Sequence, residues 1–172
     1  MINETDIQEF KARLRGELTQ RGEPRYEEAR KVFNGMIDKR PALIVRCAGV
    51  SDVIAAVNFA REAHLLAAIR GGGHGVVGNA VCDEGLVIDL SAMRSVHVDL
   101  KNQTARAEGG ATWGDFDHET QAFGLATTGG IVPTTGIAGL TLGGGIGYLN
   151  RKYGLACDNL IGAEVVTADG DI

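Results

Sequence analysis

The sequence contains few cysteines, and it lacks both a long apolar run and an apolar leader. The three cysteines (Cys47, Cys82 and Cys157) are odd in number, far apart and in no CxxC pair. This pattern argues against a disulfide framework or a zinc site, and it fits a reducing compartment. No uninterrupted apolar stretch reaches the roughly eighteen residues of a membrane-spanning helix. No charged start is followed by an apolar core, so we expect no signal peptide and a cytoplasmic protein.

Positive charge is also scarce. The chain has 17 Lys and Arg residues against 22 Asp and Glu residues, which gives a net charge of −5 at pH 7. The basic residues are scattered, so we expect neither nucleic acid nor an anionic membrane as a partner. The length of 172 residues, with 44% hydrophobic and 23% charged residues, is typical of a globular protein with one domain or two small lobes.

Glycine, by contrast, is abundant and clustered. The chain has 25 glycines, and 18 of them lie between Gly71 and Gly147. Apolar residues such as Leu140 and Ile146 lie among them and no collagen period occurs, so the region is not a flexible linker. Clustered glycines in an apolar background indicate a backbone that comes very close to something else.

The hydrophobic pattern predicts a mixture of helices and strands. Residues 1–40 are expected to form a helical lead-in, with Ile7, Phe10, Leu14 and Leu18 on one face and a second helical patch at 26–33. We expect helices capped by Ser51 and by Thr112. Strands are expected at 42–47, 65–70, 86–90, 95–100, 104–108 and 160–167, the last followed by an Asp169–Gly170 turn.

The first glycine loop reads Arg70-Gly71-Gly72-Gly73-His74-Gly75, with Gly78 after it. It contains a formal GxGxxG, but a dinucleotide fingerprint of the Rossmann type must open a helix. The turn-rich residues 76–85 lead to another strand instead, so we reject that interpretation. Successive glycine N–H groups can still form an anion-binding nest for a diphosphate, with help from Arg70. The alternative is a tight structural turn, for which three consecutive glycines would be wasteful.

His74 follows the glycines directly, and three roles are open for it: general base, metal ligand or nucleophile. A metal is the weakest option, because His64, His97 and His118 show no ligand spacing. We interpret His97 and His118 as surface residues.

A second glycine-rich stretch runs from Gly129 to Gly147 and includes Pro133-Thr134-Thr135-Gly136. Its hydroxyls can bind a polar ligand, and its apolar members can face a flat ring. Together, the two loops indicate one long ligand with phosphates at one end.

These motifs resemble a known family. The RGGGH loop is similar to that of FAD-linked oxidases with a PCMH-type (vanillyl-alcohol-oxidase-like) flavin domain. The second loop, with residues 154–159 (GLACDN) and 165–170 (VVTADG), resembles the bacterial members of the berberine-bridge-enzyme-like branch. The resemblance covers roughly residues 41–172. It implies an α+β FAD-binding domain of two lobes, at about 41–95 and about 96–172, with the second lobe incomplete.

The same resemblance implies FAD as the cofactor, bound covalently through its 8α-methyl carbon to His74. Many members of this branch carry a cysteine for a second link where this chain has Val132, so we expect a single link. Together with the loops, the resemblance predicts cofactor contacts from Arg70, Gly71, Gly72, Gly73, His74, Gly75, Gly78, Gly109, Gly130, Val132, Pro133, Thr134, Thr135, Gly136, Gly139, Gly143, Gly144, Gly145, Tyr148 and Val165.

The function implied is that of an oxidase or dehydrogenase. A C–H group next to O or N of a small-molecule substrate would pass hydride to the flavin, and O2 would reoxidise it. Family members continue into a substrate domain, which this chain lacks, and their catalytic base lies there; neither Tyr148 nor Tyr153 is assigned that role. We therefore expect an N-terminal fragment, and the alternative function is a cofactor-binding module without turnover.

Overall fold

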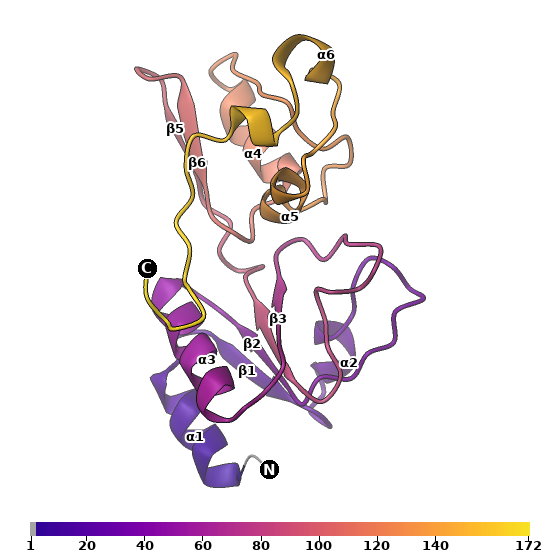
Figure 1. Ribbon diagram of the computed structural model, residues 1–172, viewed down its shortest axis with the longest axis vertical. Helices are drawn as coiled ribbons and strands as arrows, with labels where there is room; N and C mark the ends of the chain where they lie inside the picture. Colours follow the sequence, from indigo (N-terminus) through magenta and orange to yellow (C-terminus); the bar gives the residue numbers. More distant parts are fainter. Residues whose placement is uncertain (1–2) are drawn as a thin grey trace. The chain divides into compact units, whose positions relative to one another are not determined.

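The computed structural model describes residues 3–172, and the expected α+β class is confirmed (Figure 1). The chain divides into two compact units, which are described separately here. Unit 1 comprises the chain up to Arg70, Gly75–Ala92 and Glu164–Ile172, and unit 2 comprises Gly71–His74 and Met93–Ala163.

Unit 1 is built on a four-stranded sheet. Its strands, in spatial order, are β1 (Glu17–Gln20), β2 (Leu43–Arg46), β4 (Leu86–Asp89) and β3 (Ala67–Arg70). β1 pairs antiparallel with β2, whereas β2 and β3 both pair parallel with β4. The carboxyl ends of the three parallel strands therefore meet at one edge, where Arg46, Asp89 and Arg70 lie in register. β4 is buried along its whole length, and it is paired along both edges.

Helices and loops cover the two faces of this sheet. On one face, α1 (Glu4–Arg13) packs against α3 (Val50–Glu62), with the rings of Phe10 and Phe59 stacked at 4.2 Å. The core of the other face includes Ile44 and Val87 of the sheet, together with Tyr26, Ala68, Val81 and Cys82. Tyr26 begins the short helix α2 (Tyr26–Ala29).

The lead-in is not wholly helical, and Leu18 lies in β1 opposite Val45. The helix α1 ends at Arg13, and Leu14 is already extended. A Cβ on Gly16 would lie 2.0 Å from the carbonyl oxygen of Arg46, so the chain passes close to β2 before it pairs with it. Pairing with a neighbouring strand has overridden a helical spacing in the sequence.

The predicted cap of α3 was also wrong. Gly49 occupies the N-cap position without a side-chain hydrogen bond, and Ser51 lies exposed in the first turn. The buried carboxylate of Asp52 instead accepts three backbone hydrogen bonds of 2.8–2.9 Å, from the N–H groups of Arg15, Gly16 and Ala48. Asp52 therefore ties α3 to the segment that enters β1.

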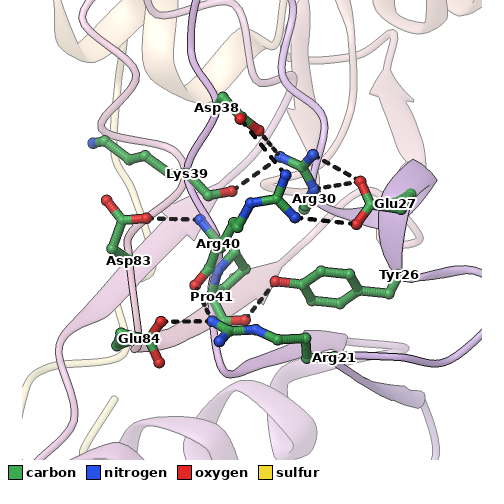
Figure 2. Close-up of polar contacts among 10 residues, drawn as sticks. All are labelled: Arg21, Tyr26, Glu27, Arg30, Asp38, Lys39, Arg40, Pro41, Asp83 and Glu84. Carbon is green, nitrogen blue, oxygen red and sulfur yellow. Dashed lines mark hydrogen bonds and ion pairs between the residues drawn. The ribbon is translucent and has the colours of Figure 1, made fainter.

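A polar network fastens the residues before β2 (Figure 2). Arg30 lies between Glu27 and Asp38, and Arg21 pairs with Glu84 at 2.7 Å. These partners are largely exposed, so each ion pair contributes little to stability. The buried hydroxyl of Tyr26 donates to the carbonyl of Pro41 at 2.7 Å. This hydrogen bond is better shielded from water than the exposed ion pairs.

Unit 2 contains the strands predicted at 95–100 and 104–108, which pair antiparallel, and the helix capped by Thr112. Its elements are β5 (Val96–Asp99), β6 (Thr104–Ala107), α4 (Trp113–Gln121), α5 (Ile137–Leu142), α6 (Asn150–Tyr153) and a 3-10 turn at Cys157–Asn159. The Asp115 carboxylate accepts the N–H of Thr112 at 2.8 Å, and the Thr112 hydroxyl accepts the N–H of Asp115 at 3.4 Å. This reciprocal capping box confirms the predicted helix start. None of the helices in residues 3–172 has the length and apolar character needed to cross a bilayer.

The strand expected at 160–167 does not form. Leu160, Ile161 and Val165 are exposed, and none of the strands in residues 3–172 pairs with this segment. A strand requires a neighbouring strand for its backbone N–H and C=O groups, and the described residues place no strand beside this one. The turn at Asp169–Gly170 is confirmed, because the N–H of Gly170 donates to the carbonyl of Thr167 at 3.0 Å.

Replacement of Asp52 by alanine should destabilise unit 1, because three backbone donors lose their common buried acceptor. We expect Asp52→Ala to lower the free energy of unfolding by about 3 kcal/mol, measured by urea denaturation. The matched control is Asp6→Ala on the exposed surface of α1, which should cost less than about 0.5 kcal/mol. Equal effects of the two substitutions would show that Asp52 does not hold this junction.

Candidate functional site

The first glycine loop follows β3 directly, and its residues Gly71–His74 belong to unit 2. No helix begins between Gly71 and Gly85, which confirms that the GxGxxG match is not a Rossmann fingerprint. Gly71 lies close to another predicted site residue, since a Cβ there would be 2.8 Å from the carbonyl oxygen of Gly109.

The two glycine loops meet where Gly72 and Gly136 touch backbone to backbone. A Cβ on Gly72 would lie 2.3 Å from the nitrogen of Gly136, and a Cβ on Gly136 would lie 2.4 Å from the nitrogen of Gly72. Real Cβ atoms do not come this close to backbone atoms, so neither position has room for any side chain. The structure thus brings together two loops that the sequence analysis linked only through a shared ligand.

The first loop also presents backbone donors. Among the described residues, the N–H groups of Gly71, Gly72 and Gly73 donate to no acceptor. Gly73 has a φ of +67°, a left-handed conformation that glycine adopts without strain. Successive backbone N–H groups of this kind are suited to binding phosphate oxygens.

His74 lies between two threonine hydroxyls of the second loop. Its Nε2 is 3.0 Å from the Thr134 Oγ1, and its Nδ1 is 3.4 Å from the Thr135 Oγ1. Partial burial lowers the pKa of His74 below its ordinary value. The imidazole is therefore neutral near pH 7, which leaves one ring nitrogen with a lone pair.

The second loop is held by the residues that lead into α4. The N–H of Trp113 donates to the carbonyl of Thr135 at 3.0 Å, and the N–H of Gly114 donates to the carbonyl of Pro133 at 2.8 Å. The N–H of Ile137 donates to the carbonyl of Ala111 at 3.0 Å. These bonds fix the backbone that carries Pro133, Thr134 and Thr135.

The indole of Trp113 packs directly against Gly129 and Gly130. A Cβ on Gly129 would lie 2.3 Å from the indole ring, and one on Gly130 would lie 2.8 Å from it. Trp113 is buried, and its Nε1 has no hydrogen-bond partner among residues 3–172. The sequence placed Trp113 on a helix but did not reveal its packing against the glycine pair. The feature that could have indicated this packing is a tryptophan directly after the capping Thr112, in a chain that later contains Gly129-Gly130.

The sequence analysis also missed the helix α5 inside the second glycine stretch. Gly136 is its N-cap, Gly139 lies within it and Gly143 ends it. Next in the chain, the carbonyls of Gly144 and Gly145 accept hydrogen bonds of 2.8–2.9 Å from residues 156 and 157. The glycines of this stretch thus lie in a short helix and in the segment after it, where Gly144 and Gly145 are hydrogen-bonded to residues 156 and 157.

Arg70, which was predicted to help bind a phosphate, is bonded to other residues of unit 1. Its buried guanidinium pairs with Asp89 at 2.8 Å and donates to the carbonyls of Ala29 and Lys31. These bonds anchor the end of β3, one residue before Gly71. A contact between Arg70 and phosphate stays a prediction.

The remaining predicted contacts are spread over both units. Gly75, Gly78 and Val165 belong to unit 1, and their contacts to a cofactor stay predictions. In unit 2, Val132 and Tyr148 are exposed, and Tyr148 keeps 83% of its surface accessible. Their contacts to a cofactor stay predictions.

Comparison with known proteins adds a family to this geometry. The family model described as FAD binding domain matches residues 41–172. The (R)-6-hydroxynicotine oxidase of Paenarthrobacter nicotinovorans is 40% identical over 159 residues, which are 92% of this chain and 35% of that protein. The chain thus spans about a third of the length of this relative.

Two solved structures share its fold. Physcomitrella patens BBE-like 1 superposes with a TM-score of 0.91 at 29% identity, over 95% of this chain and 36% of that one. The xylooligosaccharide oxidase of Myceliophthora thermophila superposes with a TM-score of 0.88 at 30% identity, over 96% and 36%. These matches confirm the resemblance drawn from the two glycine motifs, including the PCMH-type fold.

The contact between the loops can be tested with a pair of glycines from the same segment. Gly136→Ala places a methyl group against the Gly72 backbone and should lower the free energy of unfolding by about 2–3 kcal/mol. Gly139→Ala meets no atom within 4 Å, and alanine favours the helix, so stability should stay equal or rise by up to about 1 kcal/mol. Urea denaturation of both variants measures the difference, and equal stability would contradict the contact.

Proposed function

The chain belongs to the FAD binding domain family, and on this premise we propose that the protein containing it is an FAD-dependent oxidase or dehydrogenase whose flavin is covalently bound to His74. Bound FAD supplies a hydride acceptor for a substrate C–H group next to O or N. The observation that carries the proposal is a histidine held between two threonine hydroxyls, beside three backbone donors.

The residues of unit 2 fit such a cofactor. The free N–H groups of Gly71, Gly72 and Gly73 can hold diphosphate oxygens. Because the Gly72–Gly136 contact leaves no space for side chains, these donors stand close to the hydroxyl-bearing second loop. A negatively charged group and a flat ring can therefore be held by neighbouring parts of one site.

In attachment, His74 acts as the nucleophile. Its neutral ring offers a lone pair without prior deprotonation, and its hydroxyl partners orient it. The new bond would join a ring nitrogen to the 8α carbon, with loss of one methyl proton and a gain of two electrons by the flavin, which O2 would then take up. It would tether the cofactor and raise its reduction potential.

A single link is the form that this chain supports. Val132 stands where a second link would need a thiol, and Cys47 and Cys82 are buried in unit 1. Burial raises the pKa of Cys47 to about 12, so its thiolate is scarce at neutral pH. Cys157 is exposed in unit 2, but it follows the second loop instead of lying within it.

The substrate class is set outside this chain. The matched relatives are named as oxidases of 6-hydroxynicotine and of xylooligosaccharides, so amines and sugars are both candidates, with O2 as the electron acceptor. The second function, a cofactor-binding module without turnover, is favoured by the coverage of only about a third of these relatives. Reduction of the bound flavin by an amine or sugar substrate, followed by reoxidation by O2, would show turnover, whereas a bound flavin that these substrates leave oxidised would favour the binding module.

Replacement of His74 by alanine should abolish covalent attachment, because the nucleophile is lost. We expect acid-precipitated wild-type protein to keep its flavin fluorescence and His74→Ala to lose it. The matched control is His118→Ala on the exposed surface of α4, which should keep the flavin. A covalent adduct that persists without His74 would identify another residue as the anchor.

The attachment rate should depend on pH through the same ring. Protonation removes the lone pair, and burial lowers the pKa of His74 below its ordinary value of about 6.5. The rate of covalent incorporation of FAD into apoprotein should therefore stay maximal at pH 7 and reach half its maximum below pH 6.5. A midpoint above pH 7 would contradict the neutral ring. Fluorescence of acid-washed samples taken over time gives the rate at each pH.

A further inference from the structure

We propose that the buried ion pair of Arg70 and Asp89 positions the anion-binding loop, because it fixes the peptide unit that carries the N–H of Gly71. The inference rests on the proposed function, in which this N–H is the first of three that hold the diphosphate of FAD. It gives both charged residues a part in cofactor binding that needs no contact with the phosphates.

The ion pair lies at the carboxyl ends of two neighbouring parallel strands. Arg70 ends β3 and Asp89 ends β4, and the two residues are partners in the register of the sheet. Their side chains meet at 2.8 Å, and only 8% of Arg70 and 4% of Asp89 is exposed. Apolar residues of similar volume are often as stabilising as a buried ion pair, so stability alone does not account for this one.

Each member of the pair is held by further hydrogen bonds within unit 1. The Arg70 guanidinium donates to the carbonyl of Ala29 at 2.6 Å and to that of Lys31 at 3.2 Å. The Asp89 carboxylate accepts the N–H and the hydroxyl of Ser91, both at 3.0 Å. A guanidinium is a rigid fork with several donors, so it binds three oxygens at once where a lysine ammonium on a flexible stem could not hold the same geometry.

The backbone of Arg70 passes this position on to the next N–H. The Arg70 carbonyl accepts the N–H of Leu90 at 2.8 Å, so it points toward the end of β4. The peptide bonds of the described residues are all trans, and a trans peptide unit is planar with its N–H opposite its C=O. The N–H of Gly71 therefore points away from β4, on the side where residues 3–172 place no strand beside β3. The direction of this donor is set by the sheet.

The end of β3 depends on the ion pair more than the other strand ends do. Among residues 3–172, β3 pairs only with β4, whereas β2 and β4 are each paired on both sides. A strand end with a single ladder opens more readily than one held on both sides. The second loop has separate anchors at Trp113 and Gly114. Loss of the ion pair should therefore weaken diphosphate binding and leave binding of the flavin ring nearly unchanged.

The experiment measures binding of the two parts of FAD separately, by titration calorimetry of the full-length apoprotein. ADP carries the diphosphate without the flavin ring, and riboflavin carries the ring without phosphate. We expect Arg70→Lys to raise the Kd of ADP about tenfold, the effect of one hydrogen bond to a charged group. The Kd of riboflavin should change less than about twofold. The matched control is Arg46→Lys, at the exposed end of β2 in register with Asp89, which should leave both constants unchanged.

Asp89→Asn separates positioning from direct contact. This variant removes the negative charge beside the Arg70 guanidinium. If Arg70 touched the phosphates, the unpaired cation would bind ADP more tightly than in the wild-type protein. If the pair positions the Gly71 N–H, ADP should bind more weakly, as in Arg70→Lys.

Three outcomes would overturn the proposal. They are an unchanged Kd of ADP in Arg70→Lys, an equal rise of the ADP and riboflavin constants in that variant, and tighter ADP binding in Asp89→Asn. The second of these would indicate a merely structural role. Failure of the wild-type apoprotein to bind FAD would instead sink the proposed function.

A further measurement needs no variant and so does not depend on the folding of one. Amide hydrogen exchange in the wild-type apoprotein reports which N–H groups have acceptors. We expect the Leu90 amide to exchange slowly, and the Gly71 amide to exchange fast and to slow at least about tenfold when ADP is added. A Gly71 amide that is already protected without ADP would contradict the role given to the ion pair.

Discussion

The site depends on one steric constraint, the contact between the backbones of Gly72 and Gly136. It joins loops that lie some sixty residues apart, and it sets His74 against the hydroxyls of Thr134 and Thr135. Because each missing side chain would strike main-chain atoms, no change of a neighbouring side chain can make room for it. The backbone donors of Gly71, Gly72 and Gly73 and the imidazole of His74 are therefore positioned by the same rigid contact.

The second loop owes its own position to the start of α4. The capping box of Thr112 and Asp115 fixes that start, and Arg94 pairs with the Asp115 carboxylate. That hydrogen bond to Arg94 helps to lower the pKa of Asp115 to about 2, so the cap stays charged across the physiological range. A helix cap at the protein surface thus holds Thr135 in place through Trp113.

Local signals in the sequence predicted the strands that became β2 to β6 and the Thr112 cap, because each depends on neighbouring residues. The errors share a different cause. Leu18 joined a strand and residues 160–167 did not form one, since pairing is decided by partners distant in the chain. The glycine motifs predicted the site's residues, but their spacing could not reveal that the Trp113 ring fills the space beside Gly129 and Gly130.

The strand β1 has a consequence for how this domain is delimited. The match to the family model begins at residue 41, yet β1, at Glu17–Gln20, covers the outer side of β2. A version trimmed to residues 41–172 would expose the backbone N–H and C=O groups of β2 as a free edge. Free edges recruit strands from other molecules, so such a version would associate with itself. The boundary of the folding unit therefore lies upstream of the boundary of the family model.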